Sequence, residues 1–412
     1  MVTPPDYVQH NSSPIQDYEE RVALHSPEFS ADPHRAYREM RERYGSLVPV
    51  ELAPGVPATL VVGYRTALKI LNDPDHFPAD PRVWEKNVPA DCPVLPVMQW
   101  RPNPPRSAGA EHSRYRAANV SALDGVDLHA LHGIVETRAI PLINAFCAAG
   151  SADLVSQYAF PLAFDVVNAM LGCPPDISEK AVIATTAIFD GVNAEEGNRL
   201  FGEAVLELVR YKAANPGDDV TTRLLQHSAQ LDETEAVHQL ISIYGVAMGP
   251  MQSLIINTLR LILSDNRLGD NLLGGSMSTR DALDSVLFED PPLANASCTY
   301  PRQPILIDGV WLPAHQPVVI SLAGCNNDPA IGTRTNTGNR SHLAWGAGPH
   351  QCPSQSAAYL IAQESIDQLL DALPDLELAV PVEQLVWRPG SVQRTLADLP
   401  VRFPPSPPLQ VQ

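Results

Sequence analysis

One cysteine near the end of the sequence stands where its side chain could bind a metal. Cys352 closes the stretch HLAWGAGPHQC, a glycine-punctuated loop, and precedes an apolar-periodic run over 354–373 that predicts a helix. A thiolate at a helix N-terminus is stabilised by the helix dipole and by backbone N–H groups. Such a thiolate can ligate haem iron, and a cysteine ligand pushes electron density toward O–O cleavage.

Other interpretations of this loop are simpler. A lone cysteine can be a small buried apolar residue. As a nucleotide-binding loop, 346–348 lacks the third glycine, because position 351 is Gln351, and no strand leads into it. A structural zinc site needs four ligands, and the stretch offers only His350 and Cys352. A nucleophile-elbow Gly-x-Ser-x-Gly occurs nowhere in the sequence, which disfavours a Ser/His/Asp hydrolase.

Composition limits the class of protein and its partners. The chain has 412 residues, 44% of them hydrophobic, and a net charge of −19, which disfavours nucleic acid and anionic membranes as partners. Its six cysteines have no paired spacing, as in a reducing compartment. The first 18 residues lack a signal-peptide core, and no run reaches the ~18 apolar residues of a membrane span. We therefore expect a soluble cytoplasmic protein.

The elements that must position the cysteine are mostly helices. The longest apolar-periodic run, 233–264, would span roughly 48 Å and cross a whole domain. Asp32-Pro33 opens a helix that Gly45 stops, and the proline-rich segment 76–105 is irregular enough to be a substrate-side lid. Further helices are expected over 128–148, 154–171, 177–191, 194–213 and 279–289, and short strands over 47–52, 58–62, 304–313 and 317–323.

This pattern predicts a mainly α fold with a minor β part contributed by both ends of the chain. We expect one large domain over residues 28–403, with a loosely ordered segment over 1–27 and a tail over 404–412.

The Cys352 loop resembles the cysteine-ligand loop of the cytochrome P450 family. An aromatic residue, Trp345, stands seven positions before the cysteine, Gly348 four before, and the basic His350 two before. Trp345 replaces the usual phenylalanine, and Ser354 the usual glycine after the cysteine. His112 and Arg116, one helical turn apart, match the family's His-x-x-x-Arg, which together with a residue at the place of His350 binds the haem propionates. Taken alone, that pair is more typical of a solvated helix face.

The resemblance covers residues 28 to 403 and implies a haem-thiolate monooxygenase. Its cofactor would be haem b (iron protoporphyrin IX), with Cys352 as the iron ligand and the helix 233–264 crossing the buried haem. Its partners would be a small apolar organic substrate, with ferredoxin and ferredoxin reductase as electron donors. The family members that it resembles serve secondary metabolism.

The long helix departs from the family at its oxygen-activation motif. Gly249 stands at the place of the acid and Pro250-Met251 at that of the alcohol, and none of these side chains can transfer a proton. Pro250 removes a helix hydrogen bond, which predicts a kink or bulge, and taken alone indicates a simple bend. The resemblance implies catalytic positions and an apolar pocket along this stretch: Gly249, Pro250, Met251 and Gln252 for catalysis, Ala247, Gly249 and Met251 for the pocket, with Gln252 and Ser253 as the nearest polar side chains.

A second departure concerns the family's Glu-x-x-Arg pair. Asp284 stands at the position of the acid and Leu287 at that of the arginine, so these two positions are only a remnant of the motif. A buried carboxylate without a partner is costly. We expect Arg280, Arg334 or Arg340 to substitute for the missing arginine.

These departures keep two alternatives open. A peroxide-using or isomerase/dehydratase-type haem enzyme has no need of the oxygen-activation relay. A haem-containing binding or regulatory protein without catalysis would also tolerate the loss of both motifs.

Overall fold

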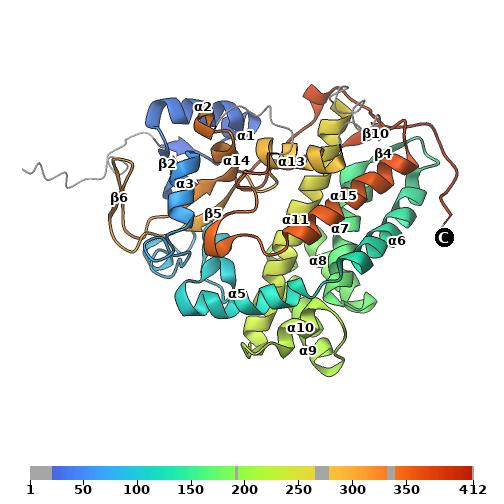
Figure 1. Cartoon of the computed structure of the whole chain (residues 1–412), viewed down its shortest axis with the longest axis horizontal. Helices are drawn as coiled ribbons and strands as arrows, with labels where there is room; N and C mark the ends of the chain where they lie inside the picture. The colour runs from blue at the N-terminus through green and yellow to red at the C-terminus, as the bar shows by residue number, and fades with distance from the viewer. Residues whose placement is uncertain (1–20, 191–193, 265–277, 332–338, 411–412) are drawn as a thin grey trace, which may run out of the picture.

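Helices dominate one side of the molecule, and a small mixed sheet lies on the other (Figure 1). The computed structural model describes residues 21–190, 194–264, 278–331 and 339–410. The expected mainly α fold with a minor β part is confirmed.

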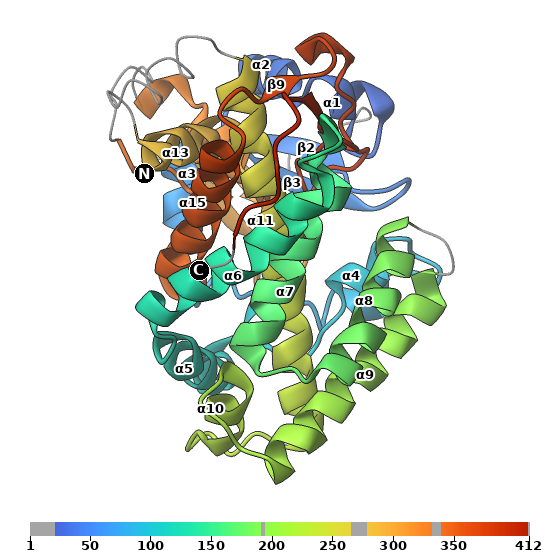
Figure 2. The same cartoon turned by 90° about the vertical axis from the view of Figure 1, so that its right-hand side faces the viewer.

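The long helix α11 (Glu233–Ser264) runs through the middle of the helical part (Figure 2). Its residues from Met251 to Leu259 are all buried, because helices pack against it from several sides. Those neighbours are α7 (Phe160–Leu171), α9 (Ala194–Ala214), α13 (Thr279–Glu289) and α15 (Gln355–Ala372). α11 is long and apolar enough to cross a membrane, but 67% of its most apolar window is buried inside the fold, as in a core helix.

The remaining helices surround this centre. They are α1 (Pro27–Ala31), α2 (Pro33–Tyr44), α3 (Tyr64–Leu71), α4 (Leu95–Met98), α5 (Gly109–Asp124), α6 (Leu128–Phe146), α8 (Pro175–Asp190), α10 (Val220–Gln226) and α14 (Leu322–Asn326).

The main sheet joins the two ends of the chain. Its strand order is β1-β2-β3-β8-β5, and β3 pairs in parallel with β8 at Thr59 opposite Val318. The strands are β1 (Val22–Ala23), β2 (Leu47–Glu51), β3 (Pro57–Val61), β5 (Asn295–Thr299) and β8 (Val318–Ser321). A second sheet has the order β4 (Ser151–Asp153), β10 (Pro400–Arg402), β9 (Glu377–Leu378), and β6 (Ile305–Ile307) forms a hairpin with β7 (Val310–Leu312).

Most sequence-based element predictions are confirmed. The runs 233–264 and 279–289 are α11 and α13 with the expected bounds. Asp32 caps α2 by accepting a hydrogen bond from the Arg35 N–H at 2.9 Å, and Gly45 ends that helix at φ +75°. The strand β5 was missed, because its sequence NASCT has little apolar character.

The structure differs from the expected domain boundaries at both ends. β1 pairs with β2 before residue 28, so part of the segment expected to be loose belongs to the sheet. In the tail, the Leu409 N–H donates to Asn144 Oδ1 on α6 at 2.7 Å, and the Asn144 amide donates back to the Leu409 carbonyl at 3.0 Å. The first 20 residues lie outside the described residues.

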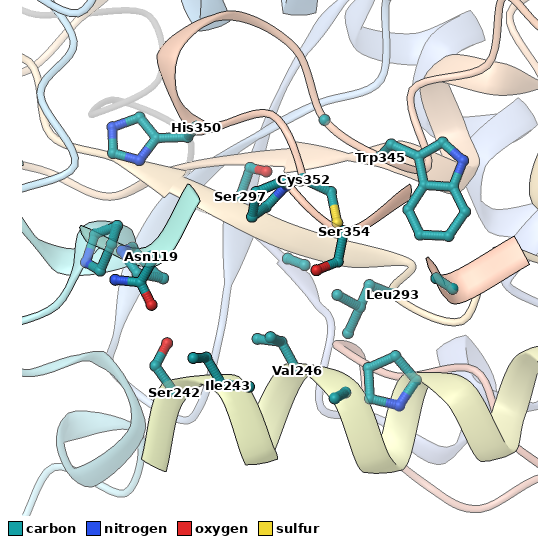
Figure 3. Close-up of a pocket in the computed structure, with 18 of the residues that line it drawn as sticks. Asn119, Ser242, Ile243, Val246, Leu293, Ser297, Trp345, His350, Cys352 and Ser354 are labelled. Atoms are coloured by element: carbon teal, nitrogen blue, oxygen red, sulfur yellow. The ribbon is translucent and has the colours of Figure 1, made fainter. Parts of the chain in front are cut away.

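A cavity of about 350 Å³ lies between α11 and the segment that carries Cys352 (Figure 3). α11 forms one wall, and the loop before α15 forms the opposite wall.

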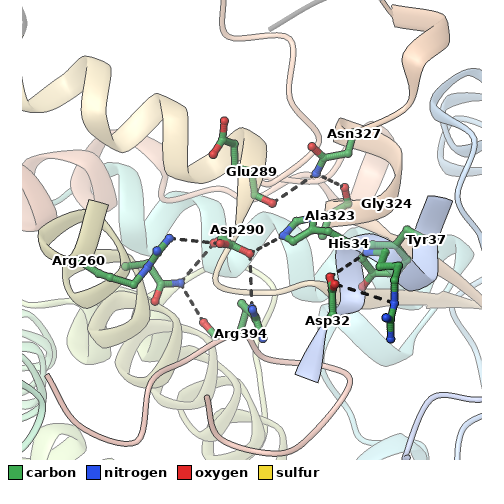
Figure 4. Close-up of polar contacts among 12 residues, drawn as sticks. Asp32, His34, Tyr37, Arg260, Glu289, Asp290, Ala323, Gly324, Asn327 and Arg394 are labelled. Atoms are coloured by element: carbon green, nitrogen blue, oxygen red, sulfur yellow. Dashed lines mark hydrogen bonds and ion pairs between the residues drawn. The ribbon is translucent and has the colours of Figure 1, made fainter. Parts of the chain in front are cut away.

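A buried carboxylate, Asp290, links three distant parts of the chain (Figure 4). It bonds His34 Nε2 of α2 at 2.7 Å, and it pairs with Arg394 and with Arg260 of α11, each at 3.4 Å. Burial alone would raise the pKa of Asp290, but the hydrogen bond from His34 and the charges of Arg394 and Arg260 lower that pKa to about 2. Asp290 therefore fixes α2 and the C-terminal segment against α11.

Replacing Asp290 should weaken the fold strongly. We expect Asp290→Asn to lower the free energy of unfolding at pH 7 by about 3–5 kcal/mol, because two arginines lose their buried counter-charge. Urea denaturation measures this change. The matched control is Glu377→Gln, which removes one partner of the exposed Arg402–Glu377 pair and should cost about 0–1 kcal/mol. Equal small losses in both variants would contradict the role given to Asp290.

The difference in the free energy of unfolding between wild type and Asp290→Asn should also depend on pH. A carboxyl group whose pKa is lowered in the folded state stabilises that state above its unfolded pKa of about 3.9, and the contribution is lost as the pH falls through about 2. The difference between wild type and Asp290→Asn should thus be constant above about pH 5 and shrink below about pH 4.

Candidate functional site

The Cys352 loop is held by its own backbone and by two glycines. The Cys352 N–H donates to the Trp345 carbonyl at 2.8 Å, and Gly346 and Gly348 have φ of +70° and +67°. A Cβ on Gly348 would lie 2.2 Å from the Leu71 carbonyl oxygen, so only glycine lets the loop lie against α3. The contribution of Gly348, which was predicted to bind the cofactor, is therefore to let the loop lie against α3. Gly346 and Trp345 line the cavity.

The sulfur of Cys352 faces the cavity just before α15, whose first residue is Gln355. Burial raises the pKa of the Cys352 thiol, while the Ser354 N–H and the Arg116 charge oppose the rise without cancelling it. The sequence predicts a thiolate stabilised by the helix N-terminus, but burial outweighs that effect. A metal cation would reverse the balance, since a coordinating thiol is deprotonated.

The three predicted propionate partners come together at one edge of the cavity. The rings of His112 on α5 and His350 in the loop lie 4.1 Å apart, and Arg116 donates to the Gln351 carbonyl. Burial, and then the neighbouring charges of His112 and Arg116, lowers the pKa of His350 to about 4. Burial also lowers the pKa of His112 and of Arg116. The three groups repel one another when charged, and an anion between them would relieve that repulsion.

These residues fit an iron porphyrin. Within the described ranges, no three His, Cys, Asp or Glu side chains gather to hold a metal, so a metal on Cys352 must bring its other ligands with it. The buried Nε2 of His112 has no hydrogen-bond partner among the described residues, as expected of a donor that awaits a carboxylate. Cys352 would hold the iron, and the basic cluster of His112, Arg116 and His350 would hold the propionates.

α11 presents an apolar face to the cavity. Ala247, Pro250 and Met251 line it. α11 continues as an α-helix through Pro250. Because proline has no N–H, the Val246 carbonyl lacks the usual donor four residues on.

Gly249 was wrongly placed in the pocket. It is buried and does not line the cavity, because it lies on another side of α11. A Cβ on Gly249 would stand 3.0 Å from Gln393 Nε2. The Gln393 amide donates to Ser253 Oγ at 2.9 Å, and the Ser253 hydroxyl donates to the Gly249 carbonyl at 2.9 Å. Gln252, predicted as catalytic, is likewise buried and not part of the cavity lining.

Asp284, the remaining acid of the Glu-x-x-Arg pair, is bound by residues other than the missing arginine. Arg340 Nε donates to Asp284 Oδ2 at 2.9 Å, the Tyr359 hydroxyl donates to Oδ1 at 2.5 Å, and Arg280 lies 3.7 Å from Oδ1. Two of the three expected substitutes are therefore confirmed, and Arg334 lies outside the described residues. Leu287, which stands at the position of the family's arginine, is buried and lines the cavity.

The remaining walls combine expected and unexpected segments. Both ends of the proline-rich segment 76–105 reach the cavity, through Phe77, Ala79, Pro104 and Pro105. None of the described residues of α8 and α9 lines the cavity. Their place is taken by residues of α7 and α10: Val167, Met170, Leu171 and Val220.

No protein-family model matches the chain, but known proteins resemble it along nearly its whole length. The monooxygenase PikC, a cytochrome P450 of Streptomyces venezuelae, is 28% identical over 91% of this chain and 92% of its own length. Cytochrome P450 105A3 of Streptomyces carbophilus is 28% identical over 92% and 96%. The solved structure of CYP154C4 from Streptomyces sp. W2061 superposes with a TM-score of 0.84 at 24% identity, covering 93% of this chain and 97% of that one.

The chain is thus similar to bacterial cytochromes P450 over about nine tenths of its length. This similarity indicates an oxygen-incorporating oxidoreductase with haem b as its cofactor. Its pattern of residues on α11 and α13 nevertheless departs from that of the family.

The contacts of Asp284 lead to a prediction about stability. Asp284→Ala should lower the free energy of unfolding by about 3–5 kcal/mol, because a buried carboxylate with two hydrogen-bond donors and a nearby arginine is removed. Arg340→Gln should cost about 1 kcal/mol or less, since 58% of the Arg340 side chain is exposed. Urea denaturation and haem content after gel filtration measure both effects. An Asp284→Ala variant with full haem content and wild-type stability would exclude a structural role.

Proposed function

We propose that this protein inserts one oxygen atom from O2 into a small apolar organic molecule. Cys352 would ligate the iron, and the basic cluster of His112, Arg116 and His350 would bind the haem propionates. One observation carries this proposal: the Cys352 sulfur and two members of the basic cluster, Arg116 and His350, line the same largely apolar cavity, and His112 lies beside His350. Bound haem would supply the activation of dioxygen, with electrons from ferredoxin and ferredoxin reductase in the cytoplasm.

The cavity supports the substrate class. Its lining is mostly aliphatic, with Ile243, Val246 and Leu254 from α11 and Leu293 from the loop before β5. Each apolar group that leaves water for such a wall contributes to binding in proportion to its buried area. The proline-rich segment 76–105 touches the cavity at both ends and would act as its lid.

Proton delivery would be atypical. The α11 side chains that line the cavity next to Pro250 are Val246, Ala247, Met251 and Leu254, and none of them carries a transferable proton. The Ser253 hydroxyl is engaged by the Gly249 carbonyl. We therefore propose that ordered water near the Val246 carbonyl, to which Pro250 cannot donate, or a hydroxyl of the substrate supplies protons.

An absorbance spectrum tests the ligation. The reduced protein exposed to carbon monoxide should give the spectrum of thiolate-ligated haem, and Cys352→Ser should lose it, because a serine oxygen is a much weaker ligand than a thiolate. Cys298→Ser is the matched control, since Cys298 lines the same cavity, and it should keep the spectrum. A colourless protein that takes up no haem on reconstitution would end the proposal.

Substitution of Pro250 tests the proton path. Pro250→Thr places a hydroxyl on the cavity wall, whereas Pro250→Ala only restores the backbone N–H. With a positioned donor typically worth 10²–10⁴-fold, Pro250→Thr should release less hydrogen peroxide per electron pair and turn over faster, by up to about 10²-fold. Pro250→Ala should stay near wild type. Equal peroxide release in all three proteins would show that proton supply is not limiting.

A further inference from the structure

A buried asparagine interrupts the apolar wall of the cavity. Asn119 on α5 is only 4% exposed and lines the cavity opposite α11. Figure 3 shows it at the same end of the cavity as Ser242 of α11, away from Trp345.

The orientation of the Asn119 amide follows from its neighbours. Gln239 on α11 is fully buried, and its Nε2 donates to the carbonyls of Pro102 and Glu235, so Gln239 Oε1 faces Asn119. Asn119 Nδ2 then donates to Gln239 Oε1 at 2.7 Å and to the Tyr115 carbonyl at 2.8 Å. The reverse orientation would set the Asn119 oxygen against two other oxygens.

Both amide hydrogens of Asn119 are thus used, and its Oδ1 is left as an acceptor that faces the cavity. No group among the described residues donates a hydrogen bond to Oδ1. An acceptor that faces the cavity without a donor from the protein leaves a place for a ligand that brings a proton. The haem propionates cannot serve, because a carboxylate offers no proton to an amide oxygen.

Ser242 provides a second polar group at this end. It lines the cavity on α11, and Figure 3 shows its hydroxyl directed toward Asn119. Its hydroxyl bonds neither Asn119 nor any other residue in the described part of the chain. An acceptor and a hydroxyl that both lack partners among the described residues therefore lie at the same end of the cavity.

We propose that Asn119 and Ser242 form a subsite for a hydroxyl group of the substrate. The substrate hydroxyl donates to Asn119 Oδ1 and accepts from the Ser242 hydroxyl. A ketone can only accept from Ser242, and a hydrocarbon satisfies neither group. This inference rests on the proposed function, which puts the substrate in this cavity, and narrows the substrate class to apolar alcohols.

Binding of three matched probes tests the subsite. Equilibrium dialysis of 2-adamantanol, 2-adamantanone and adamantane against the ferric holoprotein gives three dissociation constants without requiring turnover. We expect the alcohol to bind at least about tenfold more tightly than the ketone or the hydrocarbon, because only the alcohol satisfies both polar groups. Asn119→Leu and Ser242→Ala should each remove most of that preference.

Ile243→Ala is the matched control, since it removes apolar contact from the same wall and should weaken all three probes alike. Ser242→Ala keeps the test decisive if Asn119→Leu fails to fold. The same alcohol preference in wild type and Ser242→Ala, or no preference in wild type, would overturn the subsite. The carbon monoxide spectrum of the same samples reports haem ligation separately, so a failed subsite is distinct from a failed proposed function.

Discussion

One sulfur atom is the constraint on which this molecule depends. A metal held by a single protein atom must carry its remaining ligands with it, and a planar macrocycle with two carboxylates meets that condition. The fold then has to provide two opposed apolar walls and a cationic edge. α11 forms one wall, the Cys352 loop forms the other, and α5 with the same loop forms the basic cluster. α15, which follows the loop, packs against α11, the loop itself lies against α3, and α5 packs against α10.

Lost motif residues have been replaced by partners from other segments. Asp284 takes hydrogen bonds from Arg340 and Tyr359, where its family would use an arginine of the same helix. Asp290 draws its partners from three regions of the chain. A buried carboxylate needs counter-charge and hydrogen bonds, but these can come from any element that reaches it. The departures from the motif therefore leave the electrostatics of the interior satisfied.

Sequence reasoning found the elements whose signals are local. Apolar periodicity gave α11 and α13 their bounds, and the spacing around Cys352 identified its loop. The basic cluster could be predicted because His112, Arg116 and His350 stand at the spacings that the cytochrome P450 family uses. The side of α11 on which Gly249 lies could not be predicted. Each residue advances the helix by about 100°, and aligning two sequences does not show which side of the helix faces the cavity. Sequence reasoning did not find Gln393 and Asn119, because their contacts join segments that lie far apart in the sequence.

The parallel pairing of β3 with β8 has a consequence for synthesis of the protein on the ribosome. β3 is complete at Val61, but its partner ends at Ser321, so one edge of the nascent sheet stays open while most of the chain is made. At about 5–20 residues per second that delay lasts roughly 15–50 s. An open strand edge is a template for aggregation. Chaperone cover of the first hairpin during translation is therefore a requirement built into the topology of this sheet.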